Sequence, residues 1–283
     1  MADFAAAVTR ALGRQVDAVR PLSGGDVAEA YRVELADGER VFAKTRRSSP
    51  PGFFVTEATG LAWLRGAGAI PVPEVLHVSD DPPLLVLEWI DEGRARAGTE
   101  ASLGRALARL HASGAPCFGR EDRRTTGSRG LPNEPCASFV EFYAGQRLLP
   151  LVKLAHEADA LPASSLRALE DVAQRLADLA GPPEPPARLH GDLWGGNRLV
   201  DADGESWLID PAAHGGHREF DLAMMRLFGG FGEACFAAYA EASPLAPGWE
   251  ERVPLFQLAP LVVHAIKFGG GYAAATRRAL AAL

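Results

Sequence analysis

The sequence has little cysteine, no long apolar run and no excess of basic residues. Its three cysteines are scattered without the spacing of metal ligands, and their odd number argues against a disulfide framework. No apolar stretch approaches the roughly eighteen residues that a membrane-spanning helix needs. The first residues also lack the charged-then-apolar pattern of a secretory signal. We therefore expect a soluble protein of a reducing compartment, the cytoplasm.

The charge balance is acidic. The 283 residues carry a formal net charge of −7 at pH 7. A nucleic-acid-binding protein normally presents a basic surface, so we expect small-molecule partners rather than nucleic acid or a membrane. Hydrophobic residues make up 47% of the chain and charged residues 23%, as in an ordinary globular enzyme. The length allows one or two domains, and the sequence leaves the oligomeric state open.

One segment has the spacing of a kinase catalytic loop. Residues 189–197 read Leu-His-Gly-Asp-Leu-Trp-Gly-Gly-Asn, and residues 208–211 read Leu-Ile-Asp-Pro. Asp192, Asn197 and Asp210 are the polar side chains of this pattern. Phosphoryl transfer needs a carboxylate that accepts the proton of the attacking hydroxyl, and oxygen ligands that hold Mg²⁺ against the phosphates of ATP. We assign Asp192 as the catalytic base, and Asn197 and Asp210 as the metal ligands.

A predicted hairpin brings these three side chains together. Residues 198–200 and 206–209 have apolar, strand-like character and flank the turn Asp-Ala-Asp-Gly at 201–204. The alternative is a plain connecting loop, because aspartate- and glycine-rich stretches between apolar runs are common. The complete spacing, combined with the hairpin, favours a phosphotransferase.

A sheet-rich region is expected ahead of this segment. The patterns predict a helix at 2–12, strands at 30–35 and 40–44, a helix at 53–65, and strands at 73–78 and 84–90. A glycine turn, Ser23-Gly24-Gly25, precedes the first of these strands. Glycines let backbone N–H groups approach phosphate oxygens closely, although most such turns only connect strands. We expect the turn to contact the phosphates of a nucleotide.

Lys44 and Glu57 are a candidate ion pair. Lys44 ends a predicted strand, where a lysine is often only a solvated charge. Glu57, however, lies in the middle of the apolar face of helix 53–65, which includes Phe54 and Leu61. A carboxylate on a buried face is costly unless a cation pairs with it. The pair would position Lys44 on the nucleotide phosphates. The alternative is that Glu57 reaches solvent.

The apolar strand at 84–90 leads into a change of composition. The backbone around Glu88, Trp89 and Ile90 is a candidate for binding the adenine edge, with Trp89 beside the ring. A core strand that runs into a linker is the alternative. Beyond it, helical patterns dominate, at 100–113, 136–149, 163–180, 219–228, 231–242, 250–267 and 272–282. The fold class is therefore α+β: a nucleotide-binding lobe with an antiparallel sheet and one key helix at 1–91, and a larger, mainly helical catalytic lobe at 92–283.

Taken together, the motifs resemble the fructosamine kinase family, also called ketosamine 3-kinases. The matching stretches are 139–148, 190–197, 210–212, 216–225 and 268–272, and the likeness extends over essentially the whole chain. The resemblance implies an aminoglycoside-phosphotransferase-like, protein-kinase-like fold. It also implies ATP- and Mg²⁺-dependent phosphorylation of the sugar 3-hydroxyl of ketosamines such as ribulosamines, erythrulosamines or fructosamines. Loss of the unstable 3-phosphate would then free the glycated amine, on a small molecule or on a protein.

The resemblance also gives roles to three further residues. Asp221 matches a position that braces the catalytic loop. Trp194 stands beside two glycines, so its exposed ring would suit a sugar, with core packing as the alternative. His217 would line the same acceptor site, although a bracing role before the helix that starts at Glu219 is open as well.

Two other functions compete with this interpretation. The first is a different small-molecule kinase of the same fold, acting on an aminoglycoside, choline or homoserine. The motif after Asp210 argues against it. The second is a nucleotide-binding protein without catalysis, which the intact Asp192, Asn197 and Lys44 disfavour. Both remain open, as does the preferred ketosamine.

Overall fold

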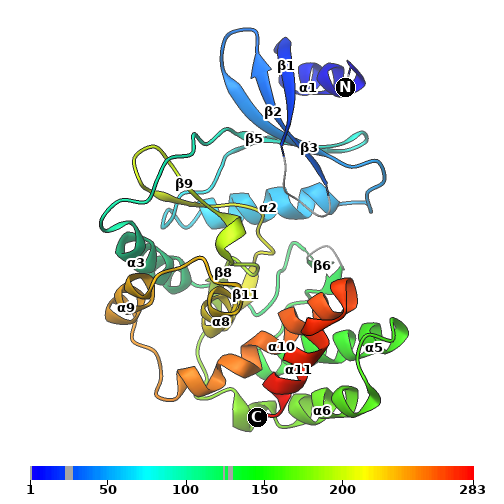
Figure 1. The fold of residues 1–283 in the computed structure, drawn as a ribbon, viewed down its shortest axis with the longest axis vertical. Helices are drawn as coiled ribbons and strands as arrows, with labels where there is room; N and C mark the ends of the chain where they lie inside the picture. Colours follow the sequence, from blue (N-terminus) through cyan, green and yellow to red (C-terminus); the bar gives the residue numbers. More distant parts are fainter. Residues whose placement is uncertain (1, 23–27, 124, 127–129) are drawn as a thin grey trace.

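The computed structural model describes residues 2–22, 28–123, 125–126 and 130–283. In Figure 1 the chain forms two lobes, with a sheet-bearing lobe at the top and a helical lobe below. The elements of the upper lobe are α1 (Ala2–Leu12), β1 (Val16–Leu22), β2 (Glu29–Leu35), β3 (Arg40–Thr45), α2 (Phe53–Arg65), β4 (Val75–Asp80) and β5 (Pro83–Glu88). The predicted α+β class is therefore confirmed.

The five strands form one antiparallel sheet in the order β1-β2-β3-β5-β4. Alternation along each strand sends side chains to opposite faces. On β5, Leu84 and Val86 pack on the α1 side with Val8, whereas Leu85 and Leu87 pack on the α2 side. Strand β5 is thus buried on both faces, as its continuous apolar sequence predicts.

The lower lobe is mainly helical. Its elements are α3 (Thr99–Ala112), β6 (Thr125–Thr126), β7 (Leu131–Pro132), α4 (Phe139–Tyr143), a π-helical turn (Ala144–Leu148), α5 (Leu149–Glu157), α6 (Ala163–Gln174), α7 (Leu176–Leu179), β8 (Ala187–Leu189), a 3₁₀ turn (Gly195–Asn197), β9 (Arg198–Val200), β10 (Ser206–Leu208), β11 (His214–Gly216), α8 (Glu219–Phe228), α9 (Glu233–Ala242), α10 (Trp249–Phe268) and α11 (Gly271–Leu280). The predicted hairpin is present, because β9 pairs with β10.

One helix prediction is wrong in its extent. The helix expected at 136–149 begins at Phe139 and continues, through the π-helical turn and α5, to Glu157. Pro150 occupies the first turn of α5, where a missing N–H group is tolerated. The helix expected at 163–180 is divided into α6 and α7 at Arg175.

An apolar cluster joins the two lobes. Phe54 and Leu61 of α2 belong to the same buried group as Leu103 and Leu107 of α3 and Met225 of α8. A backbone hydrogen bond also crosses the junction, from the N–H of Leu208 to the carbonyl of Pro71. The lobes therefore share a core, and the boundary after residue 91 stays a prediction. Among the described residues, no helix is long and apolar enough to cross a membrane.

Candidate active site

The candidate catalytic loop, residues 190–197, follows strand β8, and a buried carboxylate holds its first residues in place. Asp221 of α8 is fully buried and accepts the backbone N–H groups of His190, at 2.8 Å, and Gly191, at 2.9 Å. His111 of α3 lies 3.2 Å from the same carboxylate and contacts Tyr239 of α9 through its other ring nitrogen. The predicted contact between Asp221 and the catalytic loop is confirmed.

Asn197 ties the two candidate aspartates together. Its Nδ2 donates to the backbone carbonyl of Asp192 at 2.8 Å, to Asp192 Oδ2 at 3.1 Å, and to the backbone carbonyl of Asp210 at 3.4 Å. Asn197 therefore connects the two segments that carry Asp192 and Asp210, as the spacing and the hairpin predict. Burial raises the pKa of Asp192 to about 7, and the negative charge of Asp210 adds to this effect. A carboxylate with such a pKa is suited to accept a proton near neutral pH.

Asp210 has an unusual backbone conformation. Its φ of 53° lies in the left-handed region, which a non-glycine residue adopts at an energetic cost. Two hydrogen bonds hold the backbone of Asp210 in place. The N–H of Ile209 donates to the carbonyl of Asn197, and Nδ2 of Asn197 donates to the carbonyl of Asp210. The conformation places the Asp210 carboxylate 3.1 Å from Lys44 Nζ. A strained backbone conformation of this kind is common at functional sites, so it is consistent with a functional role for Asp210.

Lys44 and Glu57 form the predicted ion pair. Alternation in β3 places Phe42 and Lys44 on the face that α2 covers, and Glu57 projects from α2 toward it. Lys44 Nζ lies 2.6 Å from Glu57 Oε2, and both side chains are buried. Burial alone would lower the pKa of Lys44, but the charges of Glu57 and Asp210 outweigh it and raise the pKa above its ordinary value. Lys44 is therefore a fixed cation that spans from α2 to Asp210.

The donor set fits a divalent cation such as Mg²⁺. Asp210 has a half-exposed carboxylate, and Lys44 holds the pKa of this carboxyl below its ordinary value, so it is ionised. None of the contacts among the described residues uses Oδ1 of Asn197, since its three hydrogen bonds all go through Nδ2. Both residues thus present hard oxygen atoms. Mg²⁺ sites in phosphotransferases combine one or two such ligands with phosphate oxygens and water.

The candidate adenine-binding residues lie where the lobes meet. Glu88 ends β5 opposite Val41 of β3, three residues along that strand from Lys44. Trp89 Nε1 donates to Asp91 at 3.0 Å, and Ile90 is buried. These positions are compatible with an adenine contact, which stays a prediction. The predicted glycine turn, Ser23-Gly24-Gly25, lies outside the described residues.

Trp194 is exposed and lies two residues after Asp192, the candidate base. The ring is 41% exposed, and its centroid lies 6.5 Å from that of Phe228 at the end of α8. Gly196 makes this placement possible, because a Cβ at that position would come within 2.3 Å of the indole ring. Of the two interpretations of Trp194, the structure therefore favours the exposed one.

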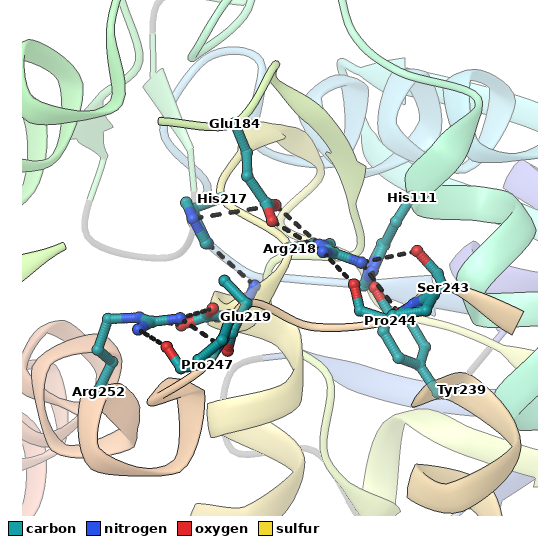
Figure 2. A network of polar contacts seen from close by, with 11 residues as sticks. His111, Glu184, His217, Arg218, Glu219, Tyr239, Ser243, Pro244, Pro247 and Arg252 are labelled. Carbon is teal, nitrogen blue, oxygen red and sulfur yellow. Dashed lines mark hydrogen bonds and ion pairs between the residues drawn. The ribbon is translucent and has the colours of Figure 1, made fainter. Parts of the chain in front are cut away.

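His217 lies elsewhere. It is buried among Phe139 and Phe256, and its Nδ1 accepts the backbone N–H of Glu219 at 3.3 Å. Figure 2 shows it beside Glu184, within a polar network centred on Arg218, with Glu219 and Arg252 close by. Burial lowers the pKa of His217 to about 4, so the ring is neutral at pH 7. These contacts are those of the bracing role rather than of an acceptor-site residue.

Comparison with known proteins identifies the family. The sequence pattern described as fructosamine kinase matches residues 1–283. The chain belongs to the fructosamine kinase family. A proposed fructosamine-3-kinase from Thermobifida fusca has a similar crystal structure, with 42% identity and a TM-score of 0.90 over 100% of this chain and 98% of that one. The family assignment makes the chain an ATP-dependent phosphotransferase with an alcohol group as acceptor.

Two relatives show what the family includes. A proposed ketoamine kinase of Synechocystis is 36% identical over 259 residues, 89% of this chain and 85% of that protein. A chloroplastic protein-ribulosamine 3-kinase of Arabidopsis thaliana is 32% identical over 273 residues, 94% of this chain and 82% of that protein. A choline kinase of Streptococcus pneumoniae, 17% identical with a TM-score of 0.68 over 99% of this chain and 97% of that one, shows the protein-kinase-like fold alone.

Two residues that support the site were not predicted. His111 of α3 contacts Asp221, and Tyr239 of α9 contacts His111, although α3 and α9 are far apart in the sequence. Neither lies in a motif with recognisable spacing. Only the packing of α3 against α9, next to α8, brings them to the catalytic loop.

Proposed function

We propose that this member of the fructosamine kinase family is a Mg²⁺-dependent ketosamine 3-kinase. Its substrates would be ketosamines such as ribulosamines, erythrulosamines or fructosamines, either free or attached to proteins. One observation carries the proposal: Asp192, whose pKa burial raises to about 7, accepts a hydrogen bond from Asn197, which also contacts the backbone of Asp210, and the exposed Trp194 follows Asp192 by two residues. The site thus offers a base, a metal-binding side and an aromatic surface for a sugar. The names of the relatives, ketoamine kinase and protein-ribulosamine 3-kinase, support the substrate class.

Each group has a defined task in this proposal. Lys44, held by Glu57, would bind phosphate oxygens of ATP, and Asn197 and Asp210 would bind the Mg²⁺ that neutralises phosphate charge. Asp192 would hold the 3-hydroxyl in line with the γ-phosphorus and accept its proton. The bond between O3 and the γ-phosphorus forms while the bond from that phosphorus to the β,γ-bridging oxygen breaks, and ADP leaves.

The instability of the proposed 3-phosphate product indicates a biological role for the reaction. A phosphate on C3, next to the keto carbon, makes the adduct unstable, so that phosphate and the sugar skeleton are lost and the amine is regenerated. The proposed reaction is therefore a repair step for glycated amines. We place it in the cytoplasm, a setting supported by the absence of any disulfide bond among Cys117, Cys136 and Cys235.

A different acceptor on the same fold is the alternative. Choline and macrolide phosphotransferases share this architecture, so the fold by itself does not choose among acceptors. A panel assay separates them: the protein is incubated with ATP, Mg²⁺ and ribulosamine, erythrulosamine, fructosamine, an aminoglycoside, choline or homoserine, and ADP formation is measured. We expect turnover with ketosamines. Turnover confined to the other acceptors would overturn the proposal.

A further inference from the structure

Lysine is rare in this chain, and its placement is uneven. Of the 29 basic residues that are lysine or arginine, only Lys44, Lys153 and Lys267 are lysines. Lys44 belongs to the cluster around Asp210, and Lys153 makes an i,i+4 ion pair with Glu157 on α5. Lysine provides a compact charge on a long flexible stem, whereas arginine provides a planar fork. In a chain that otherwise uses arginine, Lys267 is therefore a position to examine.

Lys267 lies at the end of α10 that approaches the catalytic loop. Its Nζ is 4.6 Å from the ring centre of Phe268, which is 49% exposed. The positive charge of Lys267 also acts on Asp192 and lowers the pKa of that carboxyl, against the larger effect of burial. The ammonium group is thus within electrostatic range of the Asp192 carboxylate.

A row of aromatic rings fixes this arrangement. Helix α10 packs against α8 (Figure 1). The ring of Phe228 on α8 lies 6.5 Å from Trp194 and 4.7 Å from His264, and His264 lies 5.6 Å from Phe268. We call these four residues the aromatic row. It runs from the catalytic loop to Lys267, and both of its ends are exposed. Neighbouring rings of the row thus lie close to one another from Trp194 to Phe268, with the Lys267 cation beside the last ring.

The local charge supports an anionic acceptor. Residues 252–283 contain four basic side chains, Arg252, Lys267, Arg277 and Arg278, and no aspartate or glutamate. The whole chain has a net charge of −7, so residues 1–251 carry −11 and this last segment carries +4. Arg252 is neutralised by Glu219. An anion is repelled by the field of an acidic protein as a whole, so a cation beside the base gives it a specific place to bind.

We infer that Lys267 is a specificity-determining residue of the acceptor site, which binds an anionic group of the ketosamine. The group is a carboxylate on the amine part or a phosphate on the sugar part. The inference rests on the proposed function, because it requires the 3-hydroxyl at Asp192 and the rest of the acceptor along the aromatic row. An ammonium–anion contact at a half-exposed site contributes about tenfold in affinity.

The test uses three matched acceptors with ATP and Mg²⁺: the ribulosamine of glycinamide, which lacks an anionic group, the ribulosamine of glycine, and the 5-phosphate of the first. The unmodified protein should show a kcat/KM about tenfold higher for one of the two anionic acceptors, through a lower KM. Lys267→Met should bring that ratio close to one, and Lys267→Arg should restore part of it. Lys153→Met, the matched control, should leave the ratio unchanged.

The outcomes are distinct. A Lys267-dependent preference for the glycine adduct assigns the carboxylate, and one for the 5-phosphate assigns the phosphate. Equal kcat/KM for all three acceptors, or a preference that survives Lys267→Met, overturns the inference while ketosamine phosphorylation stands. Phosphorylation of none of the three overturns the proposed function, and this inference with it.

Discussion

The two sides of Asp192 differ in kind. On one side, Lys44, Glu57 and Asp210 form a chain of charges with contacts of 2.6 and 3.1 Å. On the other, the aromatic row ends in two exposed residues, Trp194 and Phe268, and Lys267 lies against Phe268. The first side is rigid and charged, and the second is open and largely apolar.

This difference follows from what each side binds. A triphosphate with its metal has one charge pattern, so ion pairs and hard oxygen ligands are required whatever the acceptor is. Acceptors of this fold vary, and a sugar adduct offers hydroxyl groups and a carbon skeleton that rings can cover. We therefore expect changes on the charged side to abolish phosphoryl transfer, and changes on the aromatic side to alter the choice of acceptor.

Removal of the metal should have the largest effect. Excess chelator should lower phosphoryl transfer to background, because the neutral Asn197 and the anionic Asp210 bring no positive charge to the phosphates without the cation that they would hold. Addition of Mg²⁺ should restore the activity. The measurement is ADP release with and without chelator, and undiminished transfer would show that the charged side does not work through a metal.

Asp192→Asn should lower turnover by at least about a hundredfold, because it removes the proton acceptor from a positioned site. ATP binding, measured by calorimetry, should be nearly unchanged. Asp201→Asn is the matched control: this aspartate lies in the turn between β9 and β10, where it bonds Trp207 and backbone groups. A variant of Asp192 that keeps more than a tenth of the turnover would remove this residue from the role of base.

Lys44→Met should reduce kcat/KM for ATP by about tenfold or more, and Glu57→Gln should do so by a smaller factor, because the two act as one ion pair. A double-mutant cycle on activity measures their coupling. We expect the double variant to be little worse than Lys44→Met alone. Fully additive losses would mean that the contact of 2.6 Å has no part in catalysis.

Trp194→Ala should have the smallest effect on the chemistry and the clearest effect on the acceptor. We expect the KM for the ketosamine to rise about tenfold, since a stacking surface is lost, while the KM for ATP changes less than about twofold. Steady-state kinetics with each substrate varied in turn tests this. Equal increases in both KM values would place Trp194 outside the acceptor side.

Much of the charged side could be predicted from the sequence. Asp192, Asn197 and Asp210 lie within one short segment, so spacing and a turn signal suffice to bring them together. Glu57 stood out because it interrupts an apolar helical face, and Lys44 is the cation that the sheet places opposite it. Local patterns also predicted α1, α2 and α8 with their observed bounds.

The aromatic side and the support of the catalytic loop were predicted less well. Lys267 and His264 come from α10, and His111 comes from α3, so only tertiary packing brings them near Asp192. The same holds for the pairing of β8 with β11, which no local signal indicates. For His217 the sequence left two roles open, at the acceptor site or in bracing a loop, and only its packing against Phe139 and Phe256 favours the second.

The central claim is that Asp192 delivers the γ-phosphoryl group to O3 of a ketosamine. Phosphorus-coupled NMR of the freshly formed product tests it most directly. The account predicts that the phosphorus couples to the hydrogen on C3, and that the signal decays as free amine appears. Phosphate on another carbon, or phosphorylation only of aminoglycosides or amino alcohols, would contradict it.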